Sequence, residues 1–387
     1  MKKSLDASFF MLLFIKHHFG AGMIHIFAFN CNRMYVHIFA SQTAYSWALL
    51  NMMEQEVDLG NHLFIFGLGK DHPMKYPYSL KMLEKILYLK HPVDILTVLK
   101  HVYKADWIYI HLLAYDPTLL FWSFNRKLLR KSTWIVWGSD IYAFQKQKLS
   151  IRTRVYEQLR RRIIPVFSEI AAFVKEDFNL ISSVYGSTAK YLPILYPLPV
   201  SLEQLEKVGI EKKDPELIVM IGNSGDPTNN HIAMIELLSN FREFAMKVVC
   251  PLAYGGTEEY RQLVIKAGIA TFGDNFIPWL EMKGKQDYAE QLANVDIALM
   301  NHQRQQGLGN ILALLYLGKK LFIRSDTTSF LFLKRNNCLA YDIGAIKNMS
   351  FAEFSQANSE NDNVGNVEKI LRKEYSATLW KNLIKQH

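Results

Sequence analysis

The stretch 217–231, LIVMIGNSGDPTNNH, decides the fold class of this chain. Five apolar residues, a glycine-rich loop and a helix-like pattern follow one another, which is the order of a buried strand, a tight turn and a helix. Gly222 and Gly225 allow the backbone to turn sharply and to approach a ligand closely. Because the N–H groups that open a helix have no partner within it, the sequence predicts an anion-binding turn of an α/β fold.

A second unit of the same kind follows at 295–317. VDIALM at 295–300 predicts a buried strand, 301–310 a polar loop, and 311–317 an apolar helix. Each loop taken singly is more typical of an ordinary turn of any α/β domain. Parallel strands open on one edge of their sheet, however, so the pair, with Arg304, favours one crevice that holds a nucleotide diphosphate. The predicted donor-binding residues are Gly222, Asn223, Ser224, Gly225, Asp226, Asn230, Gly307, Leu308, Gly309 and Asn310.

Composition limits the class of protein. The chain has 387 residues, of which 50% are hydrophobic and 21% charged, which is enough for two domain cores and argues against disorder or a coiled coil. The cysteines, Cys31, Cys250 and Cys338, are far apart and without CxxC spacing. Neither a disulfide framework nor a zinc site is therefore expected, and a reducing compartment is indicated.

Strand and helix patterns alternate along the chain, which predicts mainly parallel sheets. The proline- and charge-rich segment 197–215 divides the chain into two halves. Pro165 makes the strand at 165–167 the weakest of the set. The predicted strands are 24–29, 63–66, 107–110, 134–136, 165–167 and 191–195 in the first half, and 217–221, 247–249, 269–272, 296–300, 320–323 and 338–341 in the second.

Residues 1–22 are treated as a separate extension. Lys2 and Lys3 precede an apolar run at 7–15 that is too short to span a bilayer and has no clear cleavage pattern. Two interpretations stay open, a true translation start at Met23 or a short helix that touches a membrane.

The net charge of +9 is concentrated in the first half. The segment 146–162, KQKLSIRTRVYEQLRRR, is strongly basic, and 121–131, FWSFNRKLLRK, interleaves aromatic and basic residues. Such a surface suits anionic lipid headgroups, although a solvated helix face fits the charge equally well. No nucleic-acid module is recognisable, so nucleic acid is not expected as a partner. The residues predicted to face a membrane are Lys146, Lys148, Arg152, Arg160, Arg161 and Arg162.

Several segments resemble one known family. They are 137–142 (WGSDIY), 222–226 with 230–232, the strand and loop at 248–254, 304–309 (RQQGLG), and His111 with 116–119. In this order they resemble glycosyltransferase family 56, the TDP-N-acetylfucosamine:lipid II N-acetylfucosaminyltransferases of enterobacterial common antigen synthesis. The resemblance runs from about residue 23 to residue 323. The family has Ala where Ser139 stands and Asn where Asp116 stands, so the glycan that is built is expected to differ more than the donor chemistry.

The resemblance implies the GT-B architecture, two Rossmann-like domains that face a central cleft. With the joint at 197–215, this architecture assigns 23–205 to the acceptor and 206–365 to the nucleotide-sugar donor, whereas a C-terminal helix at 366–387 is predicted from the sequence pattern alone. The implied enzyme moves a 4-acetamido-4,6-dideoxyhexose from dTDP to a polyprenyl-diphosphate-linked oligosaccharide, as a peripheral protein on the cytoplasmic face of the bacterial inner membrane. Another GT-B transferase of capsule, O-antigen or lipopolysaccharide synthesis, a nucleotide-sugar epimerase, and a non-catalytic membrane scaffold stay open as alternatives.

The chemistry requires a group that accepts the acceptor's proton and groups that stabilise the departing diphosphate. No Asp-x-Asp motif occurs, so we expect no metal or other cofactor, with Arg304 and the backbone N–H groups of both loops holding the diphosphate. Asp140 and His111 compete as the base, because each follows a strand of the first half. A helix N-cap for Asp140 and a hydrogen-bonded structural role for His111 are equally compatible with the sequence.

Overall fold

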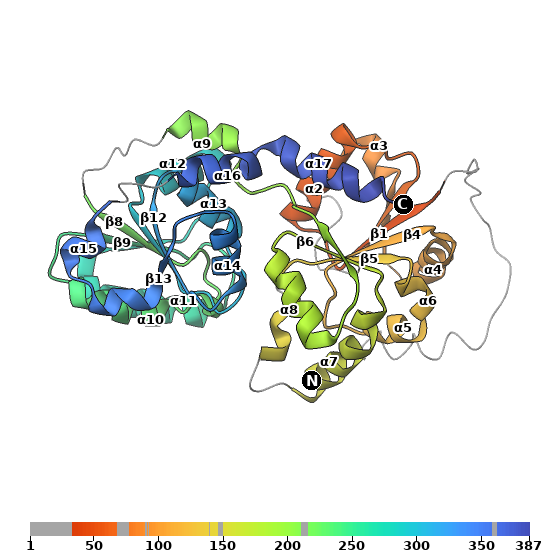
Figure 1. Ribbon diagram of the computed structural model, residues 1–387, viewed down its shortest axis with the longest axis horizontal. Coiled ribbons are helices and arrows are strands. Elements are labelled where there is room, and N and C mark those ends of the chain that lie inside the picture. Colours follow the sequence, from red (N-terminus) through yellow and green to blue (C-terminus); the bar gives the residue numbers. More distant parts are fainter. Residues whose placement is uncertain are drawn as a thin grey trace.

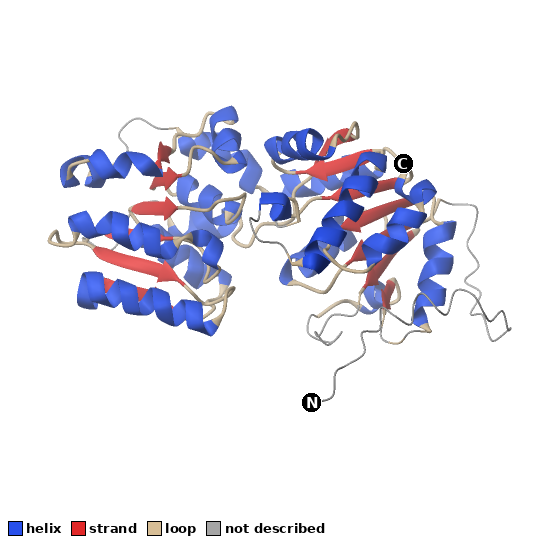
Figure 2. Cartoon of the chain, turned by 90° about the horizontal axis from the view of Figure 1, so that it is seen from below, coloured by secondary structure: helices blue, strands red, loops and turns tan. Residues whose placement is uncertain are grey.

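A computed structural model of the chain describes residues 33–67, 77–89, 91, 93–138, 140–145, 150–209, 216–357 and 362–387. It contains two parallel sheets, which lie side by side and are each covered by helices (Figures 1 and 2). The first half of the chain forms one sheet and the second half forms the other.

The N-terminal sheet has seven strands in the order β3-β2-β1-β4-β5-β6-β7, and all its pairings are parallel. Side chains alternate between its two faces, which are both covered, so its strands are almost entirely buried. The strands are β1 (Tyr35–Phe39), β2 (His62–Phe66), β3 (Ile86–Tyr88), β4 (Trp107–His111), β5 (Ser132–Ile135), β6 (Glu169–Ala172) and β7 (Lys190–Pro193).

The helices of this half divide between the two faces. Figure 1 shows the first group above the sheet and the second group below it. The first face carries α2 (Ala44–Glu56), α3 (Leu80–Leu83) and the C-terminal α17 (Lys373–Ile384). The second carries α4 (Asp94–Lys104), α5 (Thr118–Phe124), α6 (Arg126–Leu129), α7 (Ile151–Ile163) and α8 (Lys175–Tyr185), with the 3-10 turns η2 (Tyr142–Gln145) and η3 (Ile164–Val166).

The C-terminal sheet has six parallel strands in the order β10-β9-β8-β11-β12-β13. They are β8 (Ile218–Ile221), β9 (Lys247–Pro251), β10 (Phe276–Trp279), β11 (Ile297–Met300), β12 (Lys320–Ile323) and β13 (Tyr341–Asp342). One face carries α9 (Leu202–Val208), α12 (Lys285–Asn294), α13 (Leu308–Tyr316), α14 (Thr328–Arg335) and α16 (Asn363–Leu371). The other carries α10 (His231–Leu238), α11 (Glu258–Phe272) and α15 (Phe351–Ser355), with η4 (Pro227–Asn229), η5 (Ser239–Phe241), η6 (Gly273–Asn275) and η7 (Ile343–Asn348) among the connections.

Most of the predicted strands are confirmed, but two are wrong, and the one predicted at 338–341 shares only Tyr341 with β13. Residues 165–167 largely coincide with η3, where Pro165 occupies a first-turn position that needs no N–H donor, and the strand lies at Glu169–Ala172. Residues 269–272 are the last turn of α11, whose buried residues Val264, Gly268 and Phe272 recur every four positions. The neighbouring strand is Phe276–Trp279. The predicted strand at 24–29 lies outside the described residues, and β1 at Tyr35–Phe39 was not predicted.

The predicted single C-terminal helix is two helices. Arg372, in an extended conformation, separates α16 from α17. α16 packs against α13 of the second half and α17 packs against α2 of the first, as Figure 1 shows along the upper edge. Trp380 of α17 is fully buried, and its indole N–H donates to the Leu195 carbonyl at 3.0 Å. The end of the chain thus contributes to the cores of both halves.

Candidate functional site

The two predicted donor loops meet at the carboxyl edge of the C-terminal sheet. Their strands, β8 and β11, are neighbours in parallel register. The Asn229 Oδ1 atom accepts from the His302 ring at 2.8 Å, and the Asn230 amide donates to the Asn301 carbonyl at 2.7 Å. The structure therefore joins the two loops directly, side chain to backbone and side chain to side chain.

The first loop uses its polar groups to hold its own shape. The backbone N–H groups of Gly222, Asn223 and Gly225 donate to Leu299 O, Asn229 Oδ1 and Tyr254 O, at 2.9, 2.8 and 2.7 Å. These three N–H groups are therefore occupied within the protein, and the donor contacts of their residues stay a prediction. Because these hydrogen bonds fix the first loop, it supports the second loop, which it contacts.

The side chains of the first loop are also engaged. The Ser224 hydroxyl is 2% exposed and accepts from the Asn229 amide at 3.2 Å. Asp226 caps η4, because its Oδ1 atom accepts from the Thr228 N–H at 2.9 Å. Asn230 holds the second loop as described above. The structure gives these three predicted donor-binding residues structural roles.

The second loop ends in a helix start without a cap. Gly307 is the N-cap of α13 at φ 64°, and no side chain caps the helix. Among the described residues, no acceptor is recorded for the backbone N–H groups of Leu308, Gly309 and Asn310. Three aligned donors at the positive end of a helix dipole form an anion-binding arrangement.

Close neighbours explain why glycine occupies two positions of the second loop. A Cβ atom at Gly307 would lie 2.9 Å from the Asn223 side chain, and one at Gly309 would lie 2.9 Å from Pro199 in the segment that connects the two halves. Gly307 also needs its positive φ. The approach of Asn223 and Pro199 to these glycines places the start of α13 where the first loop and the connecting segment converge.

Arg304 lies beside this helix start. It is partly exposed, and no hydrogen bond or ion pair with another described residue is recorded for it. Burial would raise the pKa of Asp226, but the Thr228 hydrogen bonds and the positive charge of Arg304 bring it below its usual value. Burial, and then the charges of His231 and Arg304, lower the pKa of His302 to about 3, so His302 is neutral. Arg304 is thus a cation beside the start of α13.

The first predicted base, Asp140, is buried inside the first half. It is 3% exposed, and its carboxylate accepts from the Leu113 N–H, the Trp134 indole and the Trp137 N–H at 3.1, 2.9 and 3.1 Å. Burial raises the pKa of this carboxyl. All of its contacts are internal, which gives Asp140 a structural role in this arrangement, and its role as the base stays a prediction.

The second predicted base, His111, belongs to a row of buried rings. Its Nε2 atom lies 3.0 Å from His37 Nδ1, His37 Nε2 lies 2.9 Å from His62 Nδ1, and His111 Nδ1 is hydrogen-bonded to the Tyr196 hydroxyl. Burial lowers the pKa of His111 well below its usual value, and the ring is 1% exposed. Both ring nitrogens are engaged in this arrangement, and the role of His111 as the base stays a prediction.

The loop 137–142 of the first half contacts the second donor loop. Gly138, at φ 81°, lies against Gln305, because a Cβ atom added there would meet the end of the Gln305 side chain. The Tyr142 hydroxyl lies 2.6 Å from Asp177 Oδ1 and 2.7 Å from Thr328 Oγ1, which belongs to the second half. The WGSDIY and RQQGLG segments thus meet between the halves. Ser139 lies outside the described residues.

Sequence reasoning missed the residues that organise these loops. Asn229, His302 and Gln306 link the loops to each other, and Tyr254 accepts from the Asn223 amide at 3.0 Å. The polar run directly after β11 was a usable signal for His302 and Gln306, because residues after parallel strands gather at one edge. Tyr254 had the same signal, because it follows the predicted strand at 247–249.

The predicted membrane-facing set is partly wrong. Arg160 is fully buried, and its guanidinium donates to the Leu113 and Asp140 carbonyls. Arg152, Arg161 and Arg162 are exposed on α7. Arg160 differs because it lies on the same helix face as Ile163 and Glu157, which turns toward the core. Lys146 and Lys148 lie outside the described residues.

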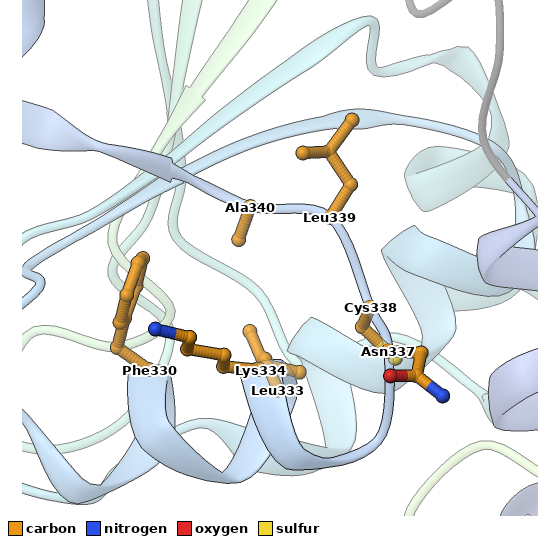
Figure 3. Close-up of a pocket in the computed structure, with 7 residues that line it drawn as sticks. All are labelled: Phe330, Leu333, Lys334, Asn337, Cys338, Leu339 and Ala340. Atoms are coloured by element: carbon orange, nitrogen blue, oxygen red, sulfur yellow. The ribbon is translucent and has the colours of Figure 1, made fainter.

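A cavity of about 420 Å³ lies elsewhere, between α14 and the segment before β13 (Figure 3). Its lining is mostly apolar, with Lys334 as the charged member, and it contains none of the predicted site residues. The lining residues are Phe330, Leu333, Lys334, Asn337, Cys338, Leu339 and Ala340.

Two further findings concern metals and membranes. Within the described ranges, no group of three or more His, Cys, Asp or Glu side chains is placed to hold a metal ion. In the same part of the chain, no helix combines the length and the apolar character needed to cross a bilayer.

The sequence matches one family model, described as 4-alpha-L-fucosyltransferase glycosyl transferase group 56, over residues 104–344. The chain belongs to this family. The match includes both donor loops and the 137–142 loop, so the contacts among these three loops lie within the matched residues. Membership of group 56 makes this chain a glycosyltransferase.

Solved structures of glycosyltransferases share the fold. Sucrose-phosphate synthase from Thermosynechococcus elongatus aligns with a TM-score of 0.65 at 10% identity, covering 92% of this chain and 99% of that one. Anabaena HepE, in complex with UDP-glucose, gives 0.60 at 13% identity, with 92% and 100% covered. WaaG, a glycosyltransferase involved in lipopolysaccharide biosynthesis, gives 0.58 at 12% identity, with 90% and 98% covered. The predicted GT-B architecture of the group 56 chain is confirmed, whereas the predicted domain boundaries stay a prediction.

Proposed function

We propose that this group 56 enzyme transfers a 4-acetamido-4,6-dideoxyhexose of the N-acetylfucosamine type from a dTDP donor to a polyprenyl-diphosphate-linked oligosaccharide. The start of α13, with Arg304 beside it, is the observation that carries the proposal. The sugar and the acceptor rest on the family resemblance of the sequence. The transfer itself is the activity class of the family.

The diphosphate is proposed to bind at Leu308, Gly309 and Asn310 through their backbone N–H groups. Negative charge increases on the leaving diphosphate as the glycosidic bond breaks, and fixed donors aimed at that charge stabilise the transition state. Arg304 adds a guanidinium, which binds phosphate oxygens in a forked geometry. Helix dipole and guanidinium together supply the charge that a metal ion supplies elsewhere, so we propose that the reaction needs no metal.

Calorimetric binding of dTDP, UDP and GDP, with and without EDTA, tests this proposal on the wild type and on Arg304→Ala. We expect EDTA-insensitive binding of dTDP that Arg304→Ala weakens by about 1–3 kcal/mol, because a charge-assisted contact is lost. Arg242→Ala is the matched control, since Arg242 is an exposed arginine of the same half that pairs with Glu243. Absence of nucleotide binding, or binding that EDTA abolishes, would contradict the proposal.

We further propose that the first half docks peripherally on an anionic membrane, at the cytoplasmic face of the bacterial inner membrane, because the acceptor is lipid-linked. The docking surface consists of exposed apolar side chains on α4, α5 and α7, among basic residues. Figure 1 shows these helices on one side of the N-terminal sheet. The apolar members, with exposed fractions of 52–82%, are Val93, Leu96, Tyr103, Phe124, Ile151 and Val155.

The charge of this docking surface fits anionic lipid. α4 carries Lys100 and Lys104, and α6, which follows α5, carries Arg126 and Lys127, all exposed. The Tyr103 hydroxyl donates to Asn125 Oδ1 at 2.5 Å, which ties α4 to the end of α5. Each basic residue near an anionic leaflet contributes about 1 kcal/mol, and apolar side chains add insertion into the interface.

Sedimentation with vesicles of anionic or neutral phospholipid tests the docking surface. We expect the wild type to bind anionic vesicles, and Leu96→Glu and Phe124→Glu to lose most of that binding while dTDP affinity is unchanged. Ile269→Glu is the control, because Ile269 is a 52% exposed apolar residue on α11 of the other half. Equal binding by all four proteins would rule out this surface.

A further inference from the structure

Leu112, the residue that follows β4, has a backbone conformation that leucine rarely adopts. Its φ angle is 69°, and among the described residues other than glycine only Asn230 and Asn337 share a positive φ. Asparagine tolerates this left-handed region, whereas a bulky apolar residue is strained there because its Cβ atom comes too close to a backbone oxygen. Such strain persists only where the surrounding structure imposes it, and it is common at functional sites.

The turn at Leu112 changes the face of the sheet to which the chain returns. Residues two apart in a strand point to the same face. His111 stacks on Phe39 at 3.8 Å, on the face that α2 and α17 cover, whereas Leu113 packs into the core of the opposite face. Leu112, between these two buried residues, is itself partly exposed at the carboxyl edge of the sheet.

Hydrogen bonds on both sides of Leu112 hold the turn. The Leu112 N–H donates to the Ile135 carbonyl at 3.1 Å, and the Leu113 N–H donates to Asp140 Oδ2 at 3.1 Å. The Leu113 carbonyl accepts from the guanidinium of Arg160, which is fully buried. A carboxylate and a guanidinium are costly to bury, and here both bind the residue that follows the turn. The packing of the first half therefore fixes the backbone at Leu112.

The turn lies at the edge of the first sheet that faces the donor loops. The Asp140 carboxylate also accepts from the Trp137 N–H at 3.1 Å, so it joins the turn to the 137–142 loop. Gly138 of that loop lies against Gln305 of the second donor loop. The turn is thus one hydrogen-bonded link from the loop that meets the other half.

We propose that Leu112 contacts the acceptor, and that Asp140 and Arg160 are positioning residues that hold it in the strained conformation for this contact. The inference rests on the proposed transfer to a polyprenyl-diphosphate-linked oligosaccharide. Leu112 belongs to the half opposite the donor loops, and its apolar side chain suits the C–H face of a sugar ring, not a diphosphate. A side chain whose backbone is already fixed loses little conformational freedom when the acceptor binds.

Replacing Leu112 with glycine tests this inference, because glycine adopts a positive φ without strain and lacks the side chain. The assay measures transfer from the dTDP-sugar to a short-chain polyprenyl-diphosphate-linked oligosaccharide. We expect the KM for this acceptor to rise about tenfold, the scale of a lost apolar contact, while dTDP affinity changes less than about twofold. The midpoint of urea unfolding should stay close to that of the wild type, since the relieved strain offsets the lost packing.

Two further variants separate the side chain from the backbone. Leu112→Ala removes the side chain but keeps the strain, so it should raise the acceptor KM as Leu112→Gly does and unfold at lower urea. Asn337→Gly is the matched control, since Asn337 also has a positive φ, of 55°, and lies exposed after α14 in the other half. It should leave the acceptor KM unaltered.

A double variant tests the positioning role of Asp140. If Asp140 acts through the turn, Asp140→Asn raises the acceptor KM of the wild type and adds less than about twofold in the Leu112→Gly background. Multiplicative effects of the two substitutions, or a fall in kcat at constant acceptor KM, would show that Asp140 acts independently of the turn.

An unchanged acceptor KM in Leu112→Gly would overturn the contact with the acceptor while leaving the proposed function intact. An equal loss of dTDP affinity would do the same, because it would assign Leu112 to the donor. A wild type that binds dTDP but transfers nothing to the lipid-linked oligosaccharide would overturn the proposed acceptor and this inference together.

Discussion

Asp140 shows how a residue that looks catalytic in sequence can hold a fold together. Its carboxylate accepts from three donors, and the buried Arg160 guanidinium donates to its backbone carbonyl. The Arg160 and Asp140 side chains lie in one buried network with Trp134, so loss of either leaves buried groups unpaired.

We expect Asp140→Asn to lower the free energy of unfolding by about 2–4 kcal/mol, because one amide oxygen cannot replace a carboxylate that accepts three hydrogen bonds. Urea unfolding measures the change. The dTDP dissociation constant should stay within twofold of the wild type when the folded variant is measured. Unchanged stability with lost turnover would instead restore Asp140 as a catalytic residue.

For single residues, the sequence predicted which segments belong to the site better than it predicted what each side chain contacts. Asp140, His111 and Arg160 lie in polar or basic motifs, yet each of them is buried. The direction of a side chain depends on its position in the strand or helix repeat, and the neighbouring apolar residues determine which face turns toward the core. Arg304 and the start of α13 follow more simply from the sequence, since a polar loop after a buried strand must lie at the sheet edge.

Helix α17 is the element that most affects the first half. It covers the histidine row, with Trp380 stacked on His111 at a ring distance of 5.7 Å. Ser376 donates to the Leu195 carbonyl at 2.6 Å, beside the segment that connects the halves. The last helix of the chain therefore holds both the first sheet and the connecting segment.

Trp380→Ala is expected to cost about 3–5 kcal/mol of unfolding free energy, because it empties a fully buried site and removes the indole donor to Leu195. Urea unfolding followed by circular dichroism measures it. Lys381→Ala, one residue further on the same helix, breaks only the exposed pair with Glu56 and should leave stability close to that of the wild type. Equal effects of the two substitutions would show that α17 is not part of this core.

Elements were predictable where the pattern had one interpretation. β8, β11 and β12 are short apolar runs bounded by turn residues, and the structure places strands there. The run at 269–272 fits a buried strand or a helix end equally well, and only its packing against Phe276 and the rest of α11 decides. The break at Arg372 was hidden because both flanking segments have helical patterns.

The whole molecule adds an interface that the sequence did not indicate. α8 of the first half packs against α14 of the second, with Glu176 paired to Arg335 at 2.7 Å and Phe173 packed on Phe332. Asp177 lies at its centre, 3% exposed, with Tyr142 as a hydrogen-bond donor and Thr328 next to that hydroxyl. Contacts between segments 150 residues apart have no local signature in a sequence.

This interface should make stability depend on pH. Burial and, to a smaller extent, the charges of Asp140 and Glu176 raise the pKa of Asp177, hydrogen bonds from Thr328 and Tyr142 oppose the rise, and the resulting pKa is about 7. In the unfolded chain the carboxyl ionises near pH 4. The folded state thus retains the proton longer, so the stability that Asp177 contributes is complete below about pH 4 and is lost as the pH rises to about 7.

Replacing Asp177 with Asn, which resembles the protonated carboxyl and can still accept from Tyr142, removes this dependence. Between pH 5 and pH 8 the wild type should lose about 3 kcal/mol of unfolding free energy relative to Asp177→Asn, about 1.4 kcal/mol for each pH unit between 5 and the folded pKa. Urea unfolding of both proteins at the two pH values measures the difference. The pH dependence that the buried histidines contribute cancels in this comparison, because both proteins contain them. Parallel profiles would mean that Asp177 is ionised in the folded state and that the contact between α8 and α14 is insensitive to its charge.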